Sequence, residues 1–373
     1  MREVAVFRTG AEPALDAVAR PGFAPEIDLA AEAAPPSHRF LRRAWFQGAG
    51  GRDPMTLVAT QLDGRVLAAL PTVATRVPGL RTVPGSYWPF RGVPIAEAMQ
   101  ADELIQFLAS RDLGWAWRLG PVNADDPVIV RLDEAASGAG WTILRRRVAT
   151  SFRLDLPAAR AAGPWPRSST LKKGRWHEKQ LARDGALDWR FLSGPDWKPA
   201  LFESLAAVER AGWVGETARS DPKFLDSKQR DMWERMARDP ALAAMMHVGL
   251  LNVGGEPVAF SFGIEAGPVR YCIATSYDRR FAKHSPGKLI SYRTYMDAAD
   301  RGIELLDDGA GDGGHKQVMG ESAGPDIVDL LFVRGRALGS LLRPFWERSG
   351  RLTRKRRACR SGRAFPFQRW WCA

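Results

Sequence analysis

The sequence predicts an α+β fold built from mixed, mostly antiparallel sheets flanked by helices. Three strand-like runs, over residues 244–253, 257–266 and 269–277, are separated by short Gly-containing turns, which is the pattern of an antiparallel meander. Helix-like segments precede and follow these runs. The chain has 373 residues, of which 45% are hydrophobic, so it is long enough for two domains with cores of their own.

Residues 1–160 are expected to form the first domain. A helix is predicted over 37–49 and a hairpin over 55–77, because Asp63-Gly64 favours a two-residue turn. The next elements are predicted in this order: a helix over 95–110, a strand over 115–120 and extended chain over 141–156. The stretch 157–169 is rich in Pro, Gly and Ala and is the best linker.

Residues 161–335 are expected to form the second domain, around the meander. Its other elements are predicted in this order: a helix over 170–185, a strand over 186–192, helices near 197–213 and 221–239, a helix from about 286, and strands over 302–308 and 326–333. The loop "GAGDGG" matches G-x-G-x-x-G, but Gly320 leaves no room for the helix that a dinucleotide fold needs. "GESAG" precedes a strand rather than a helix, so it is interpreted as a turn and not as a hydrolase nucleophile.

Several classes of protein are disfavoured by composition. The five histidines lack metal-ligand spacing, so no metal is expected. Cys272, Cys359 and Cys372 are interpreted as reduced thiols. There is no signal-peptide pattern and no apolar run of 18 residues, so a cytoplasmic location is expected.

The stretch "YDRRFAKHSPGKLISYR" concentrates basic residues where a helix begins. Ser285 is predicted to cap this helix through its hydroxyl, and Pro286 suits the first helical position because no N–H is needed there. Gly287 is expected to keep the turn open, with free N–H groups pointing outward between Lys283 and Lys288, which suits a pyrophosphate. Ser-Pro-Gly also begins ordinary helices. The face expected to pack on the sheet carries Leu289, Tyr292, Met296 and Ala299.

Five segments carry a family resemblance: "LKKGRWHEKQLARDG", "ERAGWVGE", "GGEPVAFSFG", "SYDRRFAKHSPGKLISY" and "LLDDGAGDGGHKQVMG". Over about residues 165–335 the chain resembles the acetyltransferase-like domain of the CelD/BcsL group, within the GNAT superfamily and close to the FemAB-like transferases. His315 and Asp308 depart from the family pattern, which usually has aromatic residues there. The resemblance implies tandem GNAT-like (acyl-CoA N-acyltransferase) domains, with one cofactor site in the second half and a substrate cleft closed by the first.

Such a protein is expected to transfer an acyl group from acyl-CoA, acetyl-CoA foremost, to an amine or hydroxyl. A backbone N–H between Ile273 and Tyr277 would hold the developing oxyanion. The resemblance implies cofactor contacts at Ile273, Thr275, Arg280, Lys283, His284, Ser285, Pro286, Gly287 and Lys288. It implies catalytic candidates at Glu216, Asp307 and Asp312 as proton acceptors and at Tyr292, with Tyr295 as an alternative, as the proton donor. Trp213, His315 and Lys316 are expected at the acceptor.

The C-terminal tail, residues 336–373, carries most of the charge. It has eleven Lys or Arg against one acid, a net charge of +10, which leaves +2 for the preceding 335 residues. Arg alternates with Phe and Trp, so an anionic membrane surface is one expected partner and would place the protein at the inner membrane. A cyclic dinucleotide is a second candidate, nucleic acid is disfavoured, and a solvated tail remains open.

The leading hypothesis is therefore an acyltransferase that modifies a cell-envelope polysaccharide, glycolipid or lipid precursor at the cytoplasmic membrane face. One alternative is a FemAB-like aminoacyltransferase. The other is a non-catalytic GNAT-fold effector that binds a regulatory nucleotide or a membrane through its tail.

Overall fold

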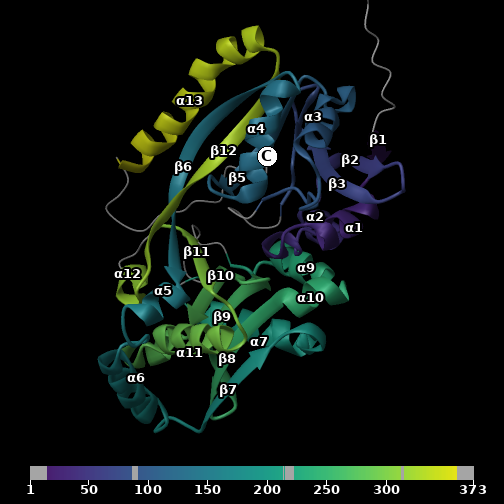
Figure 1. The fold of residues 1–373 in the computed structure, drawn as a ribbon. Helices are drawn as coiled ribbons and strands as arrows, with labels where there is room; N and C mark the ends of the chain where they lie inside the picture. The colour runs from purple at the N-terminus through teal and green to yellow at the C-terminus, as the bar shows by residue number, and fades with distance from the viewer. Residues whose placement is uncertain (1–14, 86–90, 213, 215–221, 312–314, 359–373) are drawn as a thin grey trace, which may run out of the picture.

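The computed structural model describes residues 15–85, 91–212, 214, 222–311 and 315–358, without the side chains at 315, 318 and 349–358 (Figure 1). Within these residues, one sheet of twelve strands runs through the molecule in the order β1-β2-β3-β4-β5-β12-β6-β11-β10-β9-β8-β7. The strands are Leu15–Pro21 (β1), Arg52–Gln61 (β2), Val66–Ala74 (β3), Leu80–Thr82 (β4), Ala116–Asn123 (β5), Trp141–Asp155 (β6), Leu187–Leu192 (β7), Met246–Val253 (β8), Glu256–Ala266 (β9), Val269–Tyr277 (β10), Leu305–Ala310 (β11) and Ser322–Arg334 (β12). The predicted α+β class is confirmed.

Helices cover both faces of this sheet. They are Glu26–Ala33 (α1), Arg43–Ala49 (α2), Ala101–Ala109 (α3), Pro127–Gly138 (α4), Leu156–Ala161 (α5), Ser168–Leu181 (α6), Pro199–Ala211 (α7), Ser227–Met236 (α9), Pro240–Met245 (α10), Pro286–Asp300 (α11), His315–Met319 (α12) and Arg336–Ala358 (α13). Two 3-10 turns matter for the site, Pro36–His38 (η1) and Arg279–His284 (η4). The predicted linker is thus partly helical, because Asp155 caps α5 and Pro157 suits its first turn.

The two halves of the chain repeat one strand order. In the first, β1 to β4 pair antiparallel in sequence order along β1-β2-β3-β4, and β5 then lies parallel to β4. In the second, β7 to β10 form the same antiparallel series, and β11 lies parallel to β10. The hairpin predicted at Asp63-Gly64 is β2–β3, closed by a hydrogen bond from the Gln61 N–H to the Arg65 carbonyl at 2.9 Å.

Two long strands are exchanged between the halves. β6, from the first half, pairs with β11, and β12, from the second half, pairs with β5. β6 and β12 also pair with each other, from Trp141 opposite Arg334 to Arg153 opposite Ser322, and Figure 1 shows both strands crossing the middle of the molecule. The boundary predicted near residue 160 stays a prediction, because the exchanged strands make one continuous sheet of the two halves.

Aromatic packing joins the halves on one face of the sheet. Phe262 of β9 lies against Trp233 of α9, with 4.9 Å between ring centroids, and Trp233 lies 6.2 Å from Trp45 of α2. All three side chains are fully buried. A first-half helix therefore packs on a second-half helix through core side chains, which fixes the position of one half relative to the other.

The opposite face of β8 and β9 is covered by α11, through only part of the predicted set: Leu289 is buried in a cluster with residues of both strands. Ile290, Thr294 and Ala298 are buried there, and Gly249 of β8 lies so close that a Cβ atom on it would be 2.1 Å from Thr294 Oγ1. Tyr292 and Met296, which were expected on the sheet, line a pocket toward α6. The prediction was therefore wrong for Tyr292 and Met296, because α6 provides the helix with a second partner that periodicity does not reveal.

Helix α13 changes the interpretation of the tail. Leu338, Leu342 and Trp346 pack against a buried cluster of β5, β6 and β12, and the Arg146 guanidinium lies 4.1 Å from the centre of the Trp346 ring. A solvated tail is therefore wrong for the beginning of this segment.

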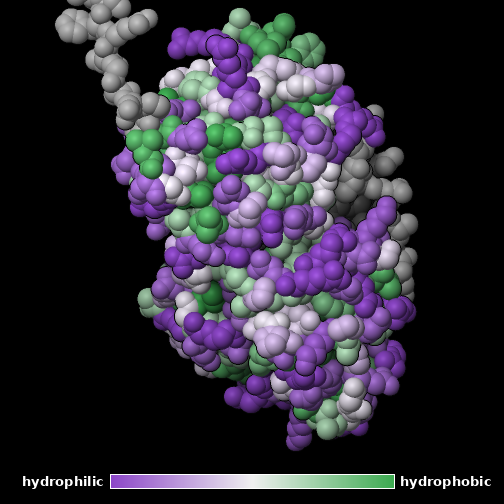
Figure 2. Space-filling model, turned by 90° about the vertical axis from the view of Figure 1, so that its right-hand side faces the viewer, coloured by the Kyte–Doolittle hydropathy of each residue, from purple (hydrophilic) through white to green (hydrophobic). Residues whose placement is uncertain are grey.

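No described helix is both long and apolar enough to cross a membrane. On the face shown in Figure 2, hydrophilic residues predominate and apolar residues form scattered patches, which is usual for a protein surface.

Candidate functional site

The entrance of α11 differs from the predicted cap. Ser285 has a left-handed backbone (φ 51°, ψ 46°), and its hydroxyl makes no cap hydrogen bond, so the predicted side-chain cap is wrong. Its carbonyl instead accepts from the N–H groups of Lys288 and Leu289 at 3.0 and 3.1 Å. Pro286 occupies the start of the helix as expected. The first turn therefore offers the Gly287 amide rather than a row of free N–H groups.

Gly287 is needed for packing. A Cβ atom at this position would lie 2.8 Å from Cδ1 of Tyr277, the last residue of β10. The ring of Tyr277 therefore closes the side of the turn that was expected to stay open. Any anion at this entrance has to be held mainly by side chains.

Such side chains come from two helices and the η4 turn between strand and helix. The pKa of His177 is lowered, first by burial and then by repulsion from Lys173, His284 and Lys288. These four groups therefore lie close together. The Nδ1 atoms of His177 and His284 are buried and have no hydrogen-bond partner among the described residues. The carboxylate of Asp184, 3.7 Å from His284 Nε2, provides the opposite charge. Because cationic groups outnumber carboxylates, an anion would relieve their mutual repulsion.

A pocket of about 220 Å³ lies between α6 and α11, beside these cations. Gly174 of α6 faces Leu289, and Tyr292 and Met296 line the α11 side. Tyr292 is half-buried, and burial raises its pKa. The pocket thus combines an apolar wall with a phenol that keeps its proton at neutral pH.

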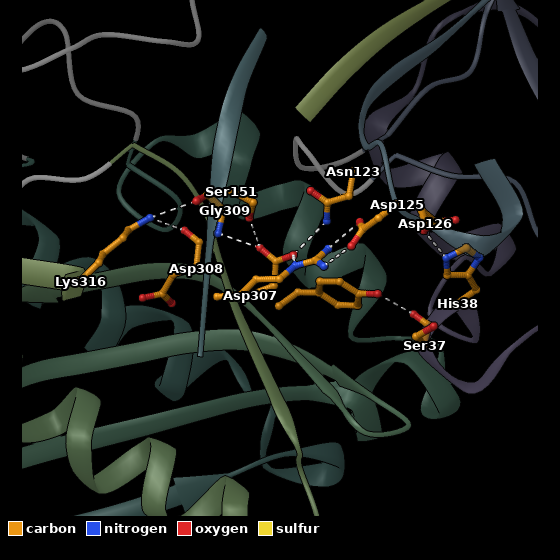
Figure 3. A network of polar contacts seen from close by, with 12 residues as sticks. Ser37, His38, Asn123, Asp125, Asp126, Ser151, Asp307, Asp308, Gly309 and Lys316 are labelled. Carbon is orange, nitrogen blue, oxygen red and sulfur yellow. Dashed lines mark hydrogen bonds and ion pairs between the residues drawn. The ribbon is translucent and has the colours of Figure 1, made fainter. Parts of the chain in front are cut away.

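Asp307, a predicted proton acceptor, lies at the centre of a polar network between the halves (Figure 3). Its carboxylate accepts hydrogen bonds from Ser151 Oγ (2.6 Å), Asn123 Nδ2 (2.9 Å), the Gly309 N–H (2.9 Å) and Arg153 Nε (3.0 Å). The side chain is fully buried. Four donors occupy the carboxylate, so Asp307 orders the junction of β5, β6 and β11 and is poorly placed to take a further proton.

A narrow pocket of about 20 Å³ lies beside this network, lined by His38, Asn123, Asp126 and Tyr271 among others. His38 Nε2 lies 2.6 Å from Asp126 Oδ2, and the Tyr271 hydroxyl donates to the Ser37 carbonyl at 3.1 Å, as Figure 3 shows in part. Burial opposes the charge of Asp126, but His38 and the amides at the start of α4 hold the pKa of Asp126 below its usual value. An ionised Asp126 accepts the Nε2 proton, so in the tautomer that carries its proton on Nε2 the lone pair of the ring lies on Nδ1.

The strands diverge next to this pocket. β10 and β11 pair through Val269–Tyr271 and Leu305–Asp307, and the register against β9 shifts between Cys272 and Ala274. Ile273 therefore lies in a bulge, opposite no residue of β9, although its side chain is buried in the core. A bulge of this kind leaves backbone groups available beside a functional site.

Residues 168–317 match the family model of the acetyltransferase (GNAT) domain. This part of the chain is a GNAT domain. The match begins at the first residue of α6 and ends within α12, so it includes the cationic entrance of α11. The predicted GNAT domain and the enzyme class, an acyltransferase, are confirmed, and the CelD/BcsL group within that superfamily stays a prediction.

Solved structures share the fold over most of the chain. FemX aligns with a TM-score of 0.56 and 9% identity, covering 85% of this chain and 98% of its own. The C-terminal domain of a protein assigned as a lysylphosphatidylglycerol synthetase from Agrobacterium fabrum aligns with a TM-score of 0.53 and 14% identity, covering 86% and 94%. No curated protein matches the chain. Because the likeness extends beyond the GNAT domain, and the first half repeats its strand order, the predicted tandem arrangement is confirmed.

A second polar cluster lies inside the GNAT domain, behind β11. Lys316 Nζ donates to the carbonyls of Asp308 (2.6 Å) and Gly309 (3.2 Å), so its ammonium is occupied within the chain. The Tyr295 hydroxyl donates to Asp308 Oδ1 at 2.8 Å, and burial raises the pKa of Tyr295 well above its usual value. Lys316 was predicted at the acceptor, and its position gives it a role in holding β11.

The other predicted residues are distributed around the GNAT domain. The Arg280 guanidinium donates hydrogen bonds to Asp278 at 2.8 Å and to Glu256 at 3.1 Å, so its charge is already paired with two carboxylates. Lys283 and Thr275 are exposed. Glu216, Asp312, Trp213 and the side chain of His315 lie outside the described residues. Sequence reasoning missed Lys173, His177 and His38 as site residues; the basic composition of the helix over 170–185 was the available signal for the first two.

The expected absence of a metal stays a prediction. Within the described residues, no group of three His, Cys, Asp or Glu side chains could hold a metal ion. The thiol of Cys272 is free, and burial raises its pKa well above the usual value, so this cysteine is a poor nucleophile.

Proposed function

We propose that this protein is an acyl-CoA-dependent N- or O-acyltransferase, acetyl-CoA being the first donor to test, and that it modifies a cell-envelope polysaccharide, glycolipid or lipid precursor. The observation that carries the donor assignment is the group of four cationic or titratable side chains at the entrance of α11. Its excess of positive charge and its two unpartnered ring nitrogens suit the diphosphate of coenzyme A.

The donor would be held from two sides. Lys173 and His177 on α6 and His284 and Lys288 at α11 would bind the diphosphate, with the Gly287 amide as a backbone donor. The thioester would then reach toward the gap between β10 and β11, where the bulge at Ile273 supports an N–H contact to the developing oxyanion. Tyr292 stays a candidate to protonate the leaving thiolate.

The acceptor would enter at the junction of the halves, beside Tyr271 and Asn123. In this proposal His38 replaces Asp307 as the base, because Asp307 already accepts four hydrogen bonds whereas His38 Nδ1 has no partner among the described residues. Asp126 would keep the ring oriented and stabilise its charged form. His38→Gln should then lower the rate of transfer by 10²-fold or more, while the affinity for coenzyme A, bound elsewhere, should not change.

The donor site is tested by calorimetry with coenzyme A and with pantetheine, which lacks the phosphates. Lys173→Glu and Lys288→Glu should each weaken binding of coenzyme A by about tenfold, because a repulsive charge replaces an attractive one. Neither should change binding of pantetheine. Lys179→Glu is the matched control, since Lys179 is an exposed lysine of the same helix and is not among the charges that act on His177.

Equal coenzyme A affinity in the wild type and both variants would contradict this donor site. Gly287→Asp would be a poorer test, because the new side chain would collide with Tyr277 as well as repel the anion. A loss of binding in that variant would have two explanations.

Aminoacyl transfer is the second candidate. It is favoured by the fold shared with FemX and with the lysylphosphatidylglycerol synthetase domain. Intact-mass spectrometry of the purified protein with acetyl-CoA, a long-chain acyl-CoA, an aminoacyl-tRNA and a cyclic dinucleotide separates the candidates. Binding of the aminoacyl-tRNA without either CoA ester would favour the second function, and binding of the cyclic dinucleotide alone would favour an effector.

A further inference from the structure

Helix α13 is mounted firmly on the sheet by its inner side. Leu338, Leu342 and Trp346 pack against Ala116, Leu144, Leu331 and Val333. Arg146 of β6 lies over the Trp346 ring at 4.1 Å. The beginning of the helix therefore has a defined orientation, and whatever its outer side carries is presented in a fixed direction.

Two large apolar side chains of α13 flank this packed side and are exposed to solvent. Leu341 is 64% exposed and Phe345 is 67% exposed, among the highest values for large apolar side chains in the described chain. They are four residues apart, so they lie on the same side of the helix one turn from each other. An exposed pair of this size costs free energy in water and is typical of a contact surface.

The net charge of the helix is strongly positive. From Arg336 to Ala358 the sequence contains eight Lys or Arg and one acid, Glu347. Arg343 lies 3.8 Å from Glu347, and both side chains are largely exposed, so this pair neutralises little of the total. The remaining cationic groups require an anionic partner or solvent.

From these observations we propose that α13 docks the protein on an anionic lipid surface, with Leu341 and Phe345 inserted among the lipid chains and the Arg side chains at the headgroups. The apolar pair distinguishes this partner from a nucleic acid, which would need the positive charge alone. A helix with cationic residues and a small apolar edge lies in the plane of the interface. The proposal is independent of the acyl donor and concerns where the enzyme meets its acceptor.

The experiment is co-sedimentation of the full-length protein with vesicles of phosphatidylcholine, alone or mixed with phosphatidylglycerol. The wild type should bind the mixed vesicles, bind phosphatidylcholine vesicles at least tenfold more weakly, and lose affinity as salt is added. Leu341→Gln with Phe345→Gln should reduce binding to mixed vesicles by at least about tenfold. Arg343→Gln with Arg348→Gln should reduce it by about tenfold and lessen the dependence on salt.

The control is Leu29→Gln with Leu62→Gln, which removes two apolar side chains that are 54% and 72% exposed and lie far from α13 in sequence. Binding by this control should equal that of the wild type, and all variants should keep the wild-type unfolding midpoint because the replaced side chains are exposed. Equal binding by the Leu341/Phe345 variant and the wild type would overturn the proposal. So would a wild type that binds a DNA or RNA oligonucleotide but not the mixed vesicles.

Discussion

Asp307→Asn is expected to destabilise the folded protein by about 3–5 kcal/mol. Ser151 and the Gly309 N–H donate to one carboxylate oxygen, and Asn123 and Arg153 donate to the other. An asparagine has one oxygen and one NH₂ group. If the NH₂ group takes the first position, the Gly309 N–H loses its acceptor, whereas the Ser151 hydroxyl can rotate to accept; if it takes the second position, Arg153 Nε–H loses its acceptor. The site is fully buried, so water cannot replace the lost acceptor, and Arg153 keeps its second partner, Asp125, at 2.6 Å.

Urea unfolding followed by tryptophan fluorescence measures this loss, and Asp326→Asn is its control. Asp326 is also paired with an arginine, Arg147, at 2.6 Å, but its side chain is 45% exposed, so its loss should cost less than about 1 kcal/mol. If Asp307→Asn unfolds at the wild-type urea concentration yet abolishes acyl transfer, then Asp307 is a catalytic base and the structural interpretation of its network is wrong.

Three further predictions concern single side chains. Burial lowers the pKa of His247 to about 4, so between about pH 6.5 and pH 4 the unfolded chain binds a proton that the folded chain does not. The free energy of unfolding should therefore fall by about 3 kcal/mol in total as the pH decreases through this range. His247→Gln should remove this pH dependence, which urea titrations at several pH values would measure. Gly287→Ala should lower the free energy of unfolding by about 1–3 kcal/mol, because the new Cβ atom would collide with the Tyr277 ring. The loss should be smaller when Tyr277 is replaced by Leu, and an equal loss in both backgrounds would argue against the contact. Thr294→Val should leave stability unchanged or raise it by about 1 kcal/mol, because the Thr294 hydroxyl is buried with no hydrogen-bond partner among the described residues, and a clear loss in thermal unfolding would reveal such a partner.

Local patterns were sufficient for several individual elements. Asp63-Gly64 specified a hairpin because a two-residue turn constrains only its own backbone, and the three strands from Met246 to Tyr277 were recognisable because each is bounded by Gly-containing turns. Pro286 marked the start of α11 for the same kind of reason, since its ring restricts one residue. The family resemblance added the GNAT domain, and with it the class of reaction.

Contacts between distant segments were decided only by the tertiary structure. The hydroxyl of Ser285 lost its predicted role because the chain enters α11 through a left-handed turn, and Gly287 faces Tyr277 rather than open space. Asp307 became the centre of a network because strand exchange brings Asn123 and Ser151 to it from 184 and 156 residues away.

What the sequence by itself determined is therefore the central meander and several neighbouring elements, the excess positive charge of the tail and the acyltransferase class; β1, α1, α4 and helix α13 were not predicted. Only the tertiary structure decided which charges meet. Lys173 and Lys288 are more than a hundred residues apart, and they share one entrance because α6 packs across the start of α11. Electrostatic and hydrogen-bonding energies fall off over a few ångströms, so the chemistry of a site depends on distances that sequence separation does not contain.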